Sequence, residues 1–172
     1  MSSKPLPEVW LRGPVPEVPA LLQPVAHALL QCREEFHAVV RSLTPDQIRA
    51  RPSGAASVSF HVRHAAGSLD RLFTYARGEA LSPEQRAALA AEGEAESGTD
   101  IGARLLEEFD AAVERALGQL RGTREDSLLE FRGVGRAQLP STVLGLLFHA
   151  AEHTTRHAGQ AVTTSRIVGV GE

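Results

Sequence analysis

The sequence predicts an all-α protein built as a four-helix bundle, and three observations support this. Four stretches place apolar side chains three and four positions apart, which is the spacing of one helix face. Alanine and leucine dominate these stretches, whereas aromatic residues make up 5% of the chain, so helices are favoured over strands. Helices with one apolar stripe each bury those stripes by packing against one another.

The length of 172 residues predicts one main domain, because a chain of this size can bury a continuous core. We place that domain at residues 21–172. Residues 1–20 are rich in proline and are expected to form an arm without regular helix. Trp10 and Leu11 are the side chains expected to anchor the arm.

The first two long helices are expected at about Leu22 or Pro24 to Leu43 and at Ser57–Arg77, before Gly78. Glycine commonly ends a helix because it adopts a left-handed conformation freely. Between them, Thr44–Gln47 has the pattern of a capping box with proline at the first helical position. It predicts a short helical turn that ends before Pro52.

A second capping box, Ser82–Gln85, predicts a short alanine-rich helix that ends at about Ala91. The polar segment 92–98, EGEAESG, is expected to be a loop. The third long helix is predicted at Thr99–Leu120. A small hairpin or extended loop is expected at Leu128–Leu139, because the residue character alternates on both sides of a glycine pair.

The last helix is predicted at Leu139–Ile167, opened by Pro140, and it carries His149, His153 and His157 at four-residue spacing. Residues four apart lie on neighbouring turns of one helix face. With about 100° per residue, His157 lies about 40° from the centre of the apolar stripe, His153 about 80° and His149 about 120°. The first two are therefore expected to face the interior and His149 to lie near its rim.

Charge and composition exclude several functions. The net charge of −3, without a basic stripe, argues against nucleic-acid binding. No apolar run approaches the ~18 residues of a membrane span, and prolines interrupt the start of the chain where a secretory signal would lie. A cytoplasmic protein without a membrane partner is expected. Cys32 lies alone on an apolar helix face and is predicted to be a buried, inert thiol.

The second predicted helix carries His61 and His64, so two helices together offer enough imidazoles to supply three ligands to one metal ion. The alternative is a set of solvated or hydrogen-bonded histidines. The two histidines outside these clusters, His27 and His37, are expected to be surface or packing residues. A zincin protease is excluded because Glu152 directly precedes His153 instead of following a histidine.

Two segments resemble the DinB/YfiT-like family. The stretch from Ser57 to Ser68 is similar to its first ligand-bearing helix, and His153–Gln160, HTTRHAGQ, resembles its HxxxH-x-GQ segment. Residues 134–140 also resemble the corresponding segment of a common subgroup of this family. The resemblance implies a four-helix bundle with an up-down-down-up arrangement and a site for Zn²⁺, Ni²⁺ or a similar ion.

On this match the metal ligands are His64, His153 and His157. The helical wheel instead places His61 about 60° from its helix's stripe and His64 about 120°. His61 therefore remains a candidate either to replace His64 or to hydrogen-bond a ligand. His149 and Gln160 are candidates for the same supporting roles, and no acid or base residue stands out.

Three imidazoles leave one coordination position open, which is typical of catalytic metal sites. Characterised members of the family include S-transferases and isomerases that use small thiols such as bacillithiol or mycothiol. The resemblance thus implies an enzyme that joins a small thiol to an electrophilic substrate, and a possible homodimer. A metal-dependent hydrolase and a non-catalytic, metal-binding stress-response module are the alternatives.

Overall fold

The computed structural model describes residues 6–94 and 98–169. Within these residues no helix is both long enough and apolar enough to cross a membrane. The fold is mostly helical, with a small antiparallel hairpin before the last helix. The α-helices are α1 (Gln23–Arg41), α2 (Pro45–Arg49), α3 (Val58–Ala76), α4 (Pro83–Ala91), α5 (Ile101–Gly122) and α6 (Val143–Gly169).

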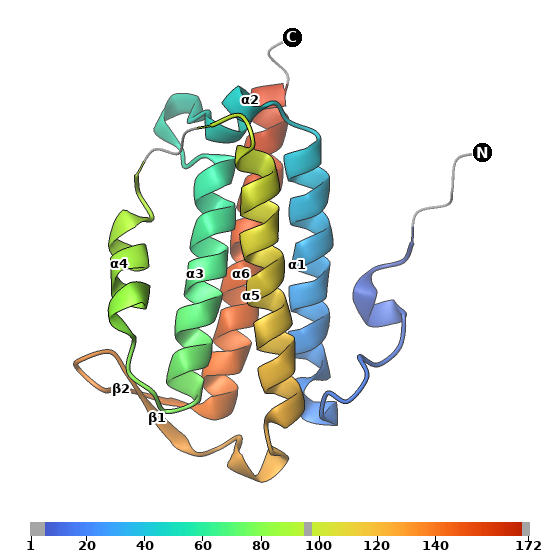
Figure 1. The fold of residues 1–172 in the computed structure, drawn as a ribbon. Coiled ribbons are helices and arrows are strands. Elements are labelled where there is room, and N and C mark those ends of the chain that lie inside the picture. The colour runs from blue at the N-terminus through green and yellow to red at the C-terminus, as the bar shows by residue number, and fades with distance from the viewer. Residues whose placement is uncertain (1–5, 95–97, 170–172) are drawn as a thin grey trace.

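The long helices α1, α3, α5 and α6 lie side by side (Figure 1). In this view α1 and α6 run upward, whereas α3 and α5 run downward. Both α1 and α3 pack against α5 and α6, so their apolar stripes meet in one core. The prediction of an all-α fold is confirmed. The bounds of α1, α3 and α5 lie within two residues of the predicted ones, whereas α6 begins four residues later than predicted.

The core is centred on Phe36 of α1 and Phe109 of α5, whose rings meet edge to face with centroids 4.8 Å apart. Each belongs to the apolar stripe of its helix, so helical periodicity alone turns both inward. Neither side chain is exposed to solvent. Other large, fully buried side chains come from all four long helices and from the turn before α1: Leu22, Leu29, Val58, Val62, Leu69, Ile101, Leu105, Val113, Leu120 and Leu147.

The predicted helix starts are largely correct. Both capping boxes are present, with the side chains of Thr44 and Ser82 accepting hydrogen bonds from the backbone at the start of α2 and α4. Ser57 caps α3 by accepting from the N–H of Phe60. At the other end of α3, Gly78 has a φ of 79°, the left-handed conformation for which glycine was expected there.

The predicted start of the last helix is wrong. Leu139–Thr142 form strand β2, which pairs with β1 (Phe131–Val134), and Pro140 lies opposite Gly133. Proline is tolerated in a two-stranded sheet because each strand has a free edge. Helix α6 begins only at Val143, where the side chain of Thr142 accepts a hydrogen bond from the N–H of Gly145 and so satisfies a free donor of the first turn.

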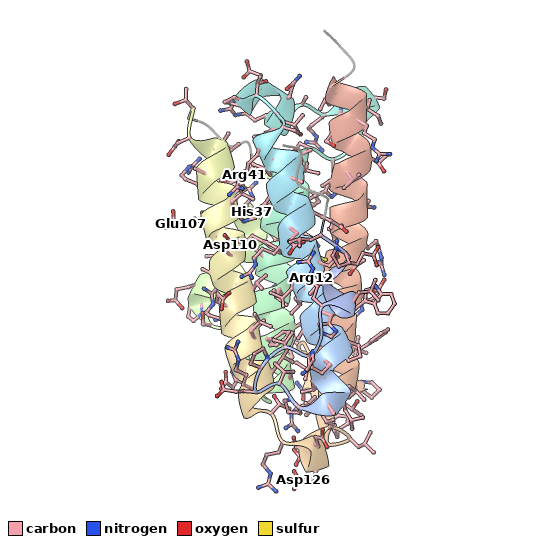
Figure 2. The ribbon with its side chains drawn as sticks, turned by 90° about the vertical axis from the view of Figure 1, so that its right-hand side faces the viewer. Arg12, His37, Arg41, Glu107, Asp110 and Asp126 are labelled. Carbon is pink, nitrogen blue, oxygen red and sulfur yellow. The ribbon has the colours of Figure 1, made fainter. Side chains whose placement is uncertain are left out.

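The N-terminal arm is anchored differently from the prediction. Trp10 and Leu11 are 60% and 57% exposed, whereas Val9 and Val18 are buried. The arm crosses α1, where Arg12 binds both carboxylate oxygens of Glu34 (Figure 2). Proline restricts the backbone of this segment, so the arm forms short 3₁₀ turns such as Val9–Leu11 instead of a regular helix. These turns determine which side chains face inward.

Removing the ring of Phe109 tests whether this side chain packs in the core. Phe109→Ala should lower the free energy of unfolding by about 3–5 kcal/mol, because it removes buried contacts and leaves a cavity. Phe148→Ala is the matched control, since its ring is 62% exposed, and it should change the stability by less than about 1 kcal/mol. Urea unfolding followed by circular dichroism measures both. Equal losses in the two variants would contradict the assignment of the core.

Candidate metal centre

The candidate site lies where α3 packs directly against α6. His64 of α3 and His153 of α6 bring their Nε2 atoms to 3.0 Å from each other. The ring of His157 lies 4.6 Å from each of the other two rings, measured between centroids. One ring nitrogen from each of these three histidines lies within 4.8 Å of the others, so the fold brings the three predicted ligands together.

His61 lies beside the group of three histidines. Its Nδ1 lies 3.0 Å from Nδ1 of His157, and its side chain is buried. It does not belong to the group of three that converges on one point. A hydrogen bond between these two atoms requires one to carry a proton and the other a lone pair. If His157 donates, its Nε2 is left with a free lone pair.

Two further candidates lie away from the three histidines. His149 is exposed and pairs with Glu152 at 3.3 Å, although its ring centroid is 5.6 Å from that of His153. Gln160 is exposed on α6. The exposure of His149 agrees with its predicted place at the rim, and the supporting roles of His149 and Gln160 stay predictions.

The environment favours the neutral form of His61, His153 and His157. Burial, the largest cause, together with the neighbouring His64, His153 and His61, lowers the pKa of His157 from its ordinary value of 6.5 to about 4. The pKa values of His61 and His153 are lowered for the same reasons, burial being the larger. Because metal ions bind neutral imidazole, these shifts leave ring lone pairs available at neutral pH.

The hydrogen-bond pattern also fits a metal ion. The Nε2 atoms of His64 and His153 cannot both carry a proton at 3.0 Å, so at least one lone pair points into the site. Nδ1 of His153 is buried without a hydrogen-bond partner among the described residues. Three imidazole nitrogens form a donor set suited to Zn²⁺ or Ni²⁺ and poorly suited to Mg²⁺ or Ca²⁺, which prefer oxygen.

Sequence reasoning missed a carboxylate that joins the site. Oε2 of Glu92 lies 2.7 Å from Nδ1 of His64, and Oε1 contacts the guanidinium of Arg71. Glu92 directly follows α4, within the segment predicted to be a polar loop. The sequence distance between Glu92 and the histidines matches no motif, because the position of Glu92 depends on how the chain after α4 packs against α3. The sequence feature that indicates close packing beside His64 is Gly67, three residues after it.

An aromatic ring also lines the site. Phe60 stacks on His64 with ring centroids 5.3 Å apart and an angle of 12° between the planes. It also meets His157 edge to face at 6.4 Å. An apolar ring against the imidazoles removes water from one side of them and restricts their rotation.

The remaining histidines and the cysteine have structural contacts. His37 binds both carboxylate oxygens of Asp110 at 2.9 Å, which links α1 to α5 (Figure 2). His27 lies 3.0 Å from the carbonyl oxygen of Gly13 in the arm. Cys32 is buried as predicted, and burial raises the pKa of its thiol to about 11. These surroundings explain the positions of all three side chains without any role in the candidate site.

Comparisons with known proteins identify the family. The DinB superfamily model matches residues 28–161, which include all three histidines of the site. The chain belongs to the DinB superfamily. A crystal structure of a conserved protein from Enterococcus faecalis is similar, with a TM-score of 0.67 and 22% identity over 88% of this chain and 98% of that one. At this identity the likeness concerns the fold of the DinB chain alone. No curated protein matches it.

The depressed pKa of His157 predicts how the stability of the metal-free DinB protein depends on pH. Above pH 6.5 the imidazole is neutral in both the folded and the unfolded chain. As the pH falls from 6.5 toward 4, the unfolded chain gains a proton that the folded site does not accept, so stability is lost. Urea unfolding at several pH values measures this loss.

The matched variants are His157→Gln and His27→Gln. The first should reduce the dependence of unfolding free energy on pH between 6.5 and 4, because it removes one of the groups with a lowered pKa. The second should retain the wild-type slope, since His27 contacts the N-terminal arm and is not among the histidines of the site. An unchanged slope in His157→Gln would contradict the role assigned to burial.

Proposed function

We propose that this protein binds a divalent metal ion, Zn²⁺ or Ni²⁺, through His64, His153 and His157. The observation that supports the proposal most directly is the convergence of one nitrogen from each ring within 4.8 Å. The lowered pKa values of His153 and His157 support it as well. On the family resemblance, we further propose that α1, α3, α5 and α6 form the up-down-down-up bundle of DinB proteins.

The proposed activity is the transfer of a small thiol, such as bacillithiol or mycothiol, to an electrophilic substrate. A divalent ion bound by three imidazoles would supply an open position with high affinity for sulfur and would favour loss of the thiol proton. The residues of the chain hold the imidazoles. His61 contacts His157, Glu92 contacts His64, and Phe60 packs against both rings.

The carboxylates around the site favour thiol transfer over hydrolysis. Both oxygens of Glu92 are engaged, by His64 and Arg71, and Glu152 pairs with Arg156. A hydrolase that activates water benefits from a free general base, whereas a thiol loses its proton far more readily than water does. A metal-dependent hydrolase and a non-catalytic metal-binding module remain the alternative proposals. A cytoplasmic location and a homodimer are proposed from composition and from the resemblance.

Metal content tests the site. Protein purified without an affinity tag should contain about one equivalent of Zn²⁺ or Ni²⁺ by elemental analysis. Each of His64→Ala, His153→Ala and His157→Ala should lose most of it, because each removes one of three ligands. His27→Ala is the control and should retain the metal. Full metal content in all three variants would exclude this set of ligands.

Turnover distinguishes the proposed activities. Metal-loaded protein is mixed with bacillithiol or mycothiol and the electrophile monochlorobimane, and conjugate formation is followed by fluorescence. We expect a rate above that of the thiol alone, and a loss of at least about tenfold in His153→Ala, as for removal of a group that acts in the reaction. Turnover of ester substrates without any thiol would instead favour the hydrolase. Metal binding without either reaction would favour the non-catalytic module.

A further inference from the structure

The connection that follows α4 inserts a buried carboxylate beside a proposed metal ligand. Glu92 is 7% exposed, although it lies in a loop and belongs to a residue type that is rarely buried without a partner. One carboxylate oxygen faces Nδ1 of His64 at 2.7 Å, and the other contacts Arg71. The charge of Glu92 is therefore compensated on both sides.

One face of α3 is built to receive this carboxylate. His64, Gly67 and Arg71 occupy positions i, i+3 and i+7, which place them on the same side of the helix. A Cβ atom at Gly67 would lie 2.5 Å from Oε1 of Glu92 and 2.8 Å from the guanidinium of Arg71. A side chain at this position would therefore require the charged ends of Glu92 and Arg71 to move.

The backbone of the connection is fixed as well. The guanidinium of Arg63 donates to the carbonyl oxygens of Glu92 and Glu94, at 2.7 and 2.6 Å. Helix α4 itself has no buried residue, so its packing alone holds the connection weakly. Gln85 of α4 donates hydrogen bonds to Asp70 and Thr74 of α3. The contacts of Arg63 and Arg71 with the chain after α4 add to this anchoring.

We propose that Glu92, held by Arg71 in the space left by Gly67, is a positioning residue that fixes His64 for metal binding. A carboxylate only accepts hydrogen bonds, so Nδ1 of His64 carries the proton and its Nε2 carries the lone pair. That nitrogen faces His153, where the proposed ion would lie. Carboxylates that orient metal-binding histidines in this way strengthen the site. The inference rests on the proposed metal site.

Metal affinity tests the proposal in the full-length, tag-free protein. Zn²⁺ affinity is measured by competition with a chromogenic chelator. Glu92→Ala should weaken binding by about 10–100-fold, and Glu92→Gln should weaken it less, because the amide oxygen still accepts from Nδ1. Gly67→Ala should also weaken binding, although it leaves every polar group in place. Glu94→Gln is the control: its side chain is exposed in the same connection, and it should bind as the wild type does.

A second measurement does not depend on the metal. Two-bond ¹H–¹⁵N correlation spectra of the metal-free protein report which ring nitrogen carries the proton, and comparison with His64→Gln assigns the signals of His64. We expect the Nδ1–H form in the wild type and a shift toward the Nε2–H form in Glu92→Ala. An unchanged tautomer together with unchanged affinity would overturn the inference. If the wild type binds no Zn²⁺ but its tautomer shifts as expected, the metal site fails and the positioning role of Glu92 stands.

Discussion

The packing of α3 against α6 is the contact on which the rest of the site depends. It brings together imidazoles that are 89 and 96 residues apart in the sequence, within 3.0 Å in both pairs. Each helix contributes two histidines separated by about one turn, so a single helix–helix register sets every distance between the histidines of the two helices. A slide of one helix by one turn, about 5.4 Å, would separate all of these pairs at once.

This packing carries a cost. Imidazoles that remain neutral and partly buried cannot all satisfy their ring nitrogens, and Nδ1 of His153 has no partner among the described residues. An apolar side chain there would avoid this unsatisfied nitrogen. Functional sites commonly retain groups that are unfavourable for folding. The stability of the bundle alone therefore does not explain why a histidine occupies this position.

Most of the fold could be predicted from the sequence, because helical periodicity and capping residues act locally. The exceptions are the side chains that anchor the N-terminal arm and the start of α6. Pro140 is compatible with both a first helical turn and an edge strand, and the pairing of β2 with β1 decides between them. Likewise, the spacing of His153 and His157 on one helix is visible in the sequence. The position of Glu92 is not, because it depends on how Arg63 and Arg71 hold the returning chain.

The state of Cys32 has a practical consequence for studying thiol chemistry in this protein. It is the one cysteine in the sequence, its side chain is 1% exposed, and burial raises the pKa of its thiol to about 11. Since the thiolate is the reactive form, the folded chain itself consumes alkylating reagents slowly. Any rapid loss of such a reagent in a reaction mixture therefore reports on the added thiol, and a reading of one accessible sulfhydryl per chain would signal unfolding.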